Sequence, residues 1–181
     1  MQQSQMVIDE KFADDFIQEY KAFLLYAYQT SVNIEDSVDN DSFEELIKKL
    51  SLGRNLYQKE KGLLTSYLDR KHNISPKIIE AIKSLEVDKW IYLRDTTRYS
   101  LFIKADETVS YAVLGLTQPI KEIFGCSGLY LETGLVLLGS QYVCDGLISN
   151  QVQLGKNYRD QFNDVYKELK QNGCFYKSPI V

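Results

Sequence analysis

The hydrophobic pattern of the chain changes its period once, at about Asp88. Before this residue, apolar side chains recur every three or four positions, which is the spacing that gives an α-helix one apolar face. After it, apolar and polar residues alternate, as in "KWIYLRD" and "RYSLFIKAD", and this is the spacing of a β-strand. One such change predicts helices first and a sheet afterwards, so we expect an α+β fold.

The strand segments after Asp88 lie too close together in sequence for parallel crossovers. The first three, at about residues 89–95, 98–106 and 109–116, are joined by short turns, whereas a parallel connection needs a dozen residues or more. Two longer strands, "LYLETGLVLL" and "QYVCDGLI", are joined at Gly139–Ser140. We therefore expect an antiparallel sheet of about five strands, with a short helix at "TQPIKEIFG" and a C-terminal amphipathic helix over about Asn157–Asn172.

The first predicted helix, from Asp9 to about Thr30, is apolar almost all round in "KAFLLYAY". Such a helix must be buried on every side, either by the rest of its own domain or by another chain. If another chain covers it, its anchors are aromatic residues on one face, since aromatic side chains contribute most to interface energies. These partner-binding candidates are Phe16, Tyr20, Phe23 and Tyr26.

The chain is expected to have three segments. Residues 1–36 form the N-terminal helix and a possible partner-binding segment, residues 37–87 are helical, and residues 88–181 form the sheet with its C-terminal helix. Residues 37–181 are expected to be one domain. Within the helical segment, "SFEELIKKLSL" and "LYQKEKGLLTSYLDRKH" are predicted to be two helices separated at Gly53.

Composition narrows the function classes. The net charge of −4 does not favour nucleic acid as a partner, because phosphate binding depends on clustered Lys and Arg. Three cysteines without a Cys-x-x-Cys spacing and a single histidine do not suggest a metal site, and no cofactor motif is present. The N-terminus does not resemble a signal peptide, and no apolar run is long enough to span a membrane. We expect a cytoplasmic protein.

The pair Gly155-Lys156 before the last helix does not make a phosphate-binding loop. That motif requires a glycine five residues before the second glycine and a Ser or Thr after the lysine, and Asn150 and Asn157 stand at those positions. No other catalytic motif is recognised, and the sequence leaves enzymatic activity open while favouring its absence.

Two carboxylates in the predicted sheet are candidates for a ligand site. Glu132 lies within an apolar strand and needs a partner if it is buried, and Asp145 lies on the next strand. Arg94, Arg98 or Lys104 would supply that partner, whereas an edge position facing water would explain Glu132 without one.

Aromatic and basic residues interleave between Lys89 and Lys104. On a sheet they would make a stacking platform for single-stranded nucleic acid. Strands are rich in aromatic residues in any case, and alternation places Trp90 and Tyr92 on one face with Ile91 on the other. A strand with one packed face and one wet face is therefore the simpler interpretation.

Three segments, "YAVLGLTQP", "LVLLGSQYVCDGLI" and "LGKNYRDQFNDVYKEL", are similar in order and spacing to a family of uncharacterised bacterial proteins. Over about residues 42–179 the chain resembles that family in its helical N-terminal part, a V-L-G-L-T-x-P segment, a hairpin ending in Y-D-G-L-L and a final helix. The matching positions are residues 113–117, Pro119, Asp145, Gly146 and Leu147. The family has no assigned activity, so the resemblance implies an architecture and no chemistry.

Departures from the family pattern fall in its turns. Gly139-Ser140 replaces a Pro-Phe pair in the long hairpin, Cys144 replaces an aromatic residue, and Gly155 alone remains of a glycine-rich turn. If that turn binds a ligand in the family, this chain is not expected to keep the ability.

The sequence favours a non-catalytic protein-protein interaction protein, an accessory subunit of a bacterial multi-protein assembly that binds another chain or itself. One alternative is a small-ligand-binding protein or enzyme with a carboxylate site against the sheet, using Glu132, Asp145, Arg94 and Arg98. The other is a single-stranded nucleic-acid-binding module on the hairpin over residues 89–104.

Overall fold

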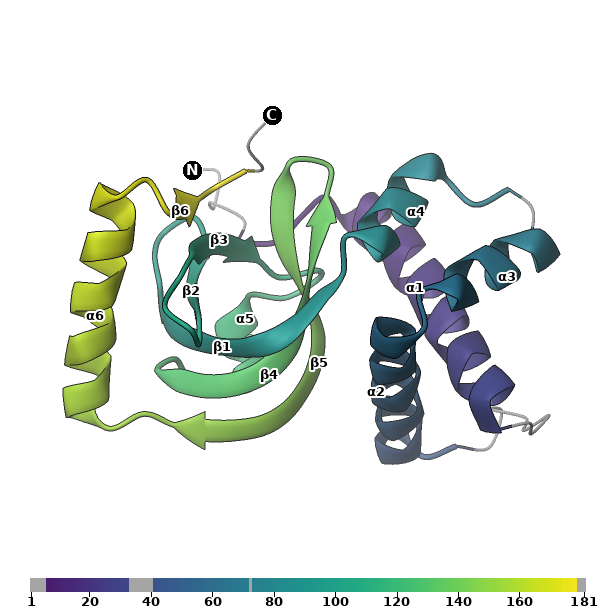
Figure 1. Cartoon of the computed structure of the whole chain (residues 1–181), viewed down its shortest axis with the longest axis horizontal. Helices are drawn as coiled ribbons and strands as arrows, with labels where there is room; N and C mark the ends of the chain where they lie inside the picture. The colour runs from purple at the N-terminus through teal and green to yellow at the C-terminus, as the bar shows by residue number, and fades with distance from the viewer. Residues whose placement is uncertain (1–5, 33–40, 72, 179–181) are drawn as a thin grey trace.

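The computed structural model describes residues 6–32, 41–71 and 73–178. Within them, six helices and six strands form the α+β fold that the sequence predicts (Figure 1). The helices are α1 (Glu10–Val32), α2 (Phe43–Lys59), α3 (Gly62–Arg70), α4 (Pro76–Lys83), α5 (Ile120–Phe124) and α6 (Lys156–Gln171). The strands are β1 (Glu86–Asp95), β2 (Ser100–Lys104), β3 (Ser110–Leu114), β4 (Leu129–Leu138), β5 (Gln141–Gln153) and β6 (Phe175–Tyr176). The predicted boundary at residues 36–37 lies outside the described residues.

Five of the strands close into a barrel in the order β1-β2-β3-β5-β4. β1 pairs antiparallel with both β2 and β4, and the pairs β2–β3 and β4–β5 are also antiparallel. The barrel closes where β3 and β5 run parallel, with Val113 opposite Tyr142 and Leu114 opposite Val143. β6 also runs parallel to β3 and pairs with its first residues, Ser110 and Tyr111, along the edge that pairs with β5 further on. The antiparallel pairs confirm the prediction, but the two parallel pairings were not expected.

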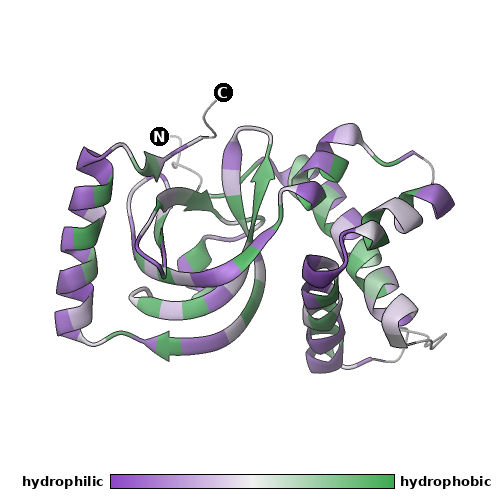
Figure 2. Ribbon diagram, viewed as in Figure 1, coloured by the Kyte–Doolittle hydropathy of each residue, from purple (hydrophilic) through white to green (hydrophobic). Residues whose placement is uncertain are grey.

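Three apolar clusters hold the layers together. The interior of the barrel is filled by large side chains such as Trp90 and Phe102, and α5 contributes Phe124 to it. A second cluster joins α1, α2, α3 and α4 to β4 and β5, on the right of the barrel in Figure 1. In the third, α6 covers the opposite side of the barrel, and Figure 2 shows its hydrophobic side turned toward the strands.

The expectation of one packed and one wet face is wrong for β1. Trp90 and Tyr92 point into the barrel, while Ile91 and Leu93 point outward and are covered by α6. All four side chains are at most 3 % exposed. The alternation along the strand is real, but a helix far along the chain covers the face that was expected to meet solvent.

The predicted helix break at Gly53 is also wrong, because α2 runs without interruption from Phe43 to Lys59. The break comes after Lys59, and Gly62 begins α3. Gly53 faces α1, and a Cβ atom added to it would collide with the backbone carbonyl of Leu24. The glycine is therefore present so that two helices can approach closely, and it does not end a helix.

We predict opposite effects of alanine at the two helical glycines. Gly53→Ala should lower the free energy of unfolding by about 1–3 kcal/mol, because one helix must move away from the other. Gly62→Ala meets no atom within 4 Å and should leave stability unchanged or raise it by about 0.5–1 kcal/mol through helix propensity. Urea unfolding of both variants measures the difference, and equal effects would contradict the proposed helix contact.

Candidate functional site

The best-defined polar site is a buried carboxylate between the helical layer and the barrel. Asp145, on β5, accepts a hydrogen bond from the Tyr20 hydroxyl on α1 at 3.0 Å. Nη1 of Arg54, on α2, lies 3.2 Å from each carboxylate oxygen. The side chains of Arg54 and Asp145 are both 0 % exposed. We call Tyr20, Arg54, Thr133 and Asp145 the Asp145 cluster.

Residues of the barrel donate further hydrogen bonds to this carboxylate. The Thr133 hydroxyl and the Gly134 N–H each donate to it at 3.3 Å, and the Leu147 N–H donates at 3.0 Å. A side chain at Gly134 would collide with the carboxylate, and Gly146 adopts a φ of 78° at the irregularity in the β4–β5 pairing, next to Leu147. Local sequence on β4 and β5 therefore makes room for this one side chain.

The charges in the cluster are fixed by burial and by each other. Burial and the Asp145 carboxylate raise the pKa of Tyr20 well above its ordinary value, so its hydroxyl stays a donor. Burial would lower the pKa of Arg54, but Asp145 raises it and the net shift is upward. Burial, followed by Asp145, also raises the pKa of the Cys144 thiol to about 12, so the thiol is not a nucleophile near neutral pH.

Arg54 is not fully satisfied by this arrangement. Its Nη1 also donates to the Leu147 carbonyl at 2.7 Å. Its Nε and Nη2 are buried and have no hydrogen-bond partner among the described residues. Unpaired buried donors cost about 1–3 kcal/mol each. Burial of this guanidinium would therefore be unfavourable without the ion pair to Asp145.

The structure separates the four ligand-site candidates from the sequence. Asp145 belongs to the cluster, but Glu132 is half-buried and accepts a hydrogen bond from Ser149 at 3.2 Å instead. Arg94 hydrogen-bonds to Asn163 and lies 5.5 Å from the ring centre of Tyr166 on α6. Arg98 is exposed in the turn between β1 and β2. These four side chains do not converge on one site.

Sequence reasoning missed Arg54, which is the actual partner of Asp145. Its signal was present in the helical pattern, because Arg54 falls four residues after Leu50 on the buried face of α2. A charged residue in line with apolar ones is expected to have a buried partner. Nothing local identifies that partner, which lies 91 residues away in sequence.

The partner-binding candidates lie mostly inside the fold. Phe16 and Phe23 are 0 % exposed and Tyr20 is 5 % exposed. Tyr26 is half-buried and its ring packs against Tyr67. Of the two explanations for the all-round apolar helix, the structure supports burial by the chain's own helices and barrel.

The aromatic residues of the β1–β2 hairpin offer no stacking surface. Trp90, Tyr92 and Phe102 are each 0 % exposed inside the barrel. Here α6 covers the outer side of β1 and β2 with the apolar residues Tyr166 and Leu169. The geometry therefore does not support nucleic-acid binding on this hairpin.

An apolar groove of about 360 Å³ lies beside the Asp145 cluster. It is bounded by α1, α2, the segment between β3 and α5, α5 itself and β5, and we call it the α1–α2 groove. Its lining residues are Ile17, Tyr20, Lys21, Leu24, Phe43, Ile47, Leu50, Leu116, Thr117, Ile123, Cys144, Asp145, Gly146 and Leu147. Phe43 and Ile123 are 77 % and 36 % exposed. Contiguous exposed apolar patches are a common feature of interaction sites.

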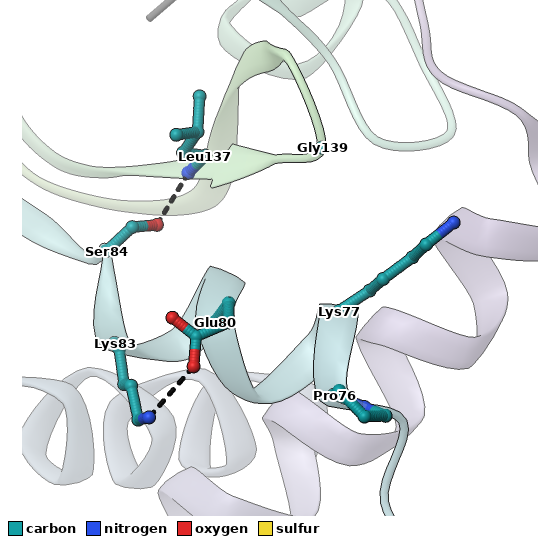
Figure 3. A pocket seen from close by; sticks show the side chains of 7 residues that line it. All are labelled: Pro76, Lys77, Glu80, Lys83, Ser84, Leu137 and Gly139. Carbon is teal, nitrogen blue, oxygen red and sulfur yellow. Dashed lines mark hydrogen bonds and ion pairs between the residues drawn. The ribbon is translucent and has the colours of Figure 1, made fainter. Parts of the chain in front are cut away.

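A second hollow lies between α4 and the turn that joins β4 to β5 (Figure 3). Three of its four polar side chains are engaged with one another or with the backbone. Glu80 and Lys83 form an ion pair at 2.8 Å, and the Ser84 hydroxyl accepts the Leu137 N–H at 2.7 Å. Lys77 extends along the other side, away from these two contacts (Figure 3). The hollow has no converging groups that would bind or transform a ligand.

We predict that Asp145→Asn lowers the free energy of unfolding by about 3–5 kcal/mol, because it leaves the buried charge of Arg54 without a counter-ion. The double variant Arg54→Met/Asp145→Asn should lose less than the sum of the two single variants, since it removes that charge. Urea unfolding at neutral pH measures all three.

Glu80→Gln is the matched control, because it removes an exposed carboxylate from an ion pair on α4. It should change stability by no more than about 0.5–1 kcal/mol. A loss for Asp145→Asn as small as that of Glu80→Gln would show that the buried pair does not hold the layers together.

Among the described residues, no group of three or more His, Cys, Asp or Glu side chains is placed to hold a metal ion. None of the helices described is both long and apolar enough to cross a membrane. No protein-family model matches the chain, and no curated protein or solved structure is significantly similar to it.

Proposed function

We propose that the chain is a non-catalytic protein-interaction module, an accessory subunit of a bacterial multi-protein assembly, and that a partner protein inserts apolar side chains into the α1–α2 groove. The observation that carries this proposal is the exposure of Phe43 and Ile123 on either side of an apolar hollow. Interfaces are commonly built from apolar anchors that fill such hollows.

The ionisable groups of the groove favour a binding role over a catalytic one. Asp145 is saturated by donors from four elements, so it is not available as a general base. Cys144 is buried with a raised pKa. The hydroxyl of Tyr20 stays protonated because its pKa is raised, and the exposed Lys21 is the other ionisable side chain that lines the groove. A site of this composition binds an apolar group and has no proton donor and acceptor pair to act on it.

The size of the groove also favours side chains as its occupants. Small-molecule pockets typically range over about 300–1,000 Å³, and this groove is at the low end of that range. It is open along one side between two helices and the barrel, where a partner segment can lie across it. The free thiols Cys126, Cys144 and Cys174 suit a reducing compartment, and we propose a cytoplasmic location on that basis.

We predict that Phe43→Ser abolishes partner binding without unfolding the protein, because Phe43 is mostly exposed at the start of α2. Leu52→Ser is the matched control, since Leu52 lies on the same helix, is 43 % exposed and does not line the groove. Each tagged protein is purified gently from its host and its mass is measured by native mass spectrometry. A second polypeptide should accompany the wild-type protein and Leu52→Ser, but not Phe43→Ser.

Two results would overturn the proposal. A second polypeptide retained equally by Phe43→Ser would place the interface elsewhere on the molecule. A monomer carrying an extra mass of a few hundred daltons that Phe43→Ser loses would assign the groove to a small apolar ligand. If Phe43 is instead an anchor of the interface, its loss is expected to weaken partner binding by roughly 30-fold or more.

A further inference from the structure

The two ends of the barrel differ in what fills them. At one end α5 places Ile120 and Phe124 against the interior cluster. At the other end the interior positions become polar, because β1 continues from Trp90 to Asp88 and Glu86 on the same face. Lys104 on β2 is paired with Trp90 and therefore lies beside them. We call this second end the barrel mouth.

Three tyrosines complete the barrel mouth. Strand register places Tyr111 opposite Phe102 and Tyr142 opposite Val113, so both rings point toward the interior side at this end. The ring centres of Tyr111 and Tyr142 are 4.4 Å apart, and that of Tyr176 on β6 is 5.9 Å from Tyr111. All three residues are half-buried, so each remains partly accessible to solvent.

The charges at the mouth do not cancel. Lys104 Nζ lies 2.6 Å from a Glu86 oxygen and 3.1 Å from an Asp88 oxygen, so two carboxylates share one ammonium group. These carboxylate side chains are 42 % and 39 % exposed. Burial, followed by the charge of Glu86, raises the pKa of Tyr111 to about 12, so this ring is neutral near pH 7. Lys177, next to Tyr176, lies over the ring of Tyr99.

We propose that the barrel mouth binds an organic cation, with its charged nitrogen on the faces of Tyr111, Tyr142 and Tyr176 and with Glu86 as the counter-ion. Tyrosine faces attract ammonium and guanidinium groups, and quaternary ammonium ligands are bound by groups of such rings. Barrel mouths are common places for small ligands. An anion would meet surplus negative charge here.

The same cation chemistry has two sources, a free ammonium compound or a Lys or Arg side chain of a peptide. Titration with choline followed by NMR tests the proposal, with the ring signals of Tyr111 and the indole of Trp90 as reporters. Trp90 is the single tryptophan, and its ring centre is 5.8 Å from that of Tyr111. The neutral isostere 3,3-dimethylbutan-1-ol is the ligand control, and acetyl-trimethyllysine amide represents the side-chain source.

The proposal predicts saturable shifts with choline or with the lysine derivative, and binding of the neutral isostere weaker by roughly fivefold or more. Tyr142→Leu and Glu86→Gln should each weaken cation binding by roughly three- to fivefold. Tyr158→Leu is the control variant, since Tyr158 is 61 % exposed on α6. Tighter binding of choline would indicate a free ammonium compound, and tighter binding of acetyl-trimethyllysine amide would indicate a side chain of a peptide.

Equal binding of choline and its neutral isostere would overturn the proposal, as would shifts that are the same in wild type and Tyr142→Leu. Absence of any shift with both cations would overturn it too. The circular dichroism of each variant must match wild type, because Tyr142 also packs against the barrel interior. Glu86→Gln keeps the shape of the side chain and tests the charge separately.

Discussion

The ion pair between Arg54 and Asp145 is the interaction on which the arrangement of the two layers depends. It joins a helix to a strand far away in sequence, in a place that water does not reach. Tyr20 adds a second helix to the same carboxylate. Apolar burial is non-directional, whereas a buried charge is costly to leave without its counter-ion.

This arrangement has consequences for where binding can occur. Asp145 is taken up by structure, so the groove beside it is left with an apolar lining and one exposed lysine. Over residues 90–93, the inner and outer faces of β1 are covered by the barrel core and by α6. The two binding sites that we propose, the α1–α2 groove and the barrel mouth, differ in chemistry. The first is apolar, and the second is aromatic with surplus negative charge.

The fold class follows from sequence because it depends on local periodicity. The change of period at Asp88 predicts the helices, the antiparallel pairs and the C-terminal helix. The role of Gly53 was misread because the requirement for glycine comes from the close approach of α1, a neighbouring helix. The parallel closure of β3 on β5, the cover of α6 over β1 and the pairing of Arg54 all join distant segments. The local pattern carries no information about such contacts. Of the candidate site, the sequence therefore predicted Asp145 but not its partner Arg54.

The most direct test of this account is whether the helical layer and the barrel unfold together. Trp90 is the single tryptophan and lies inside the barrel, so its fluorescence follows the barrel. Far-ultraviolet circular dichroism at the helical band follows chiefly α1, α2 and α6. The account predicts that both signals change at the same urea concentration in the wild-type protein. Loss of the helical signal at a lower concentration than the Trp90 transition would show that the Asp145 cluster does not join the two layers into one unit.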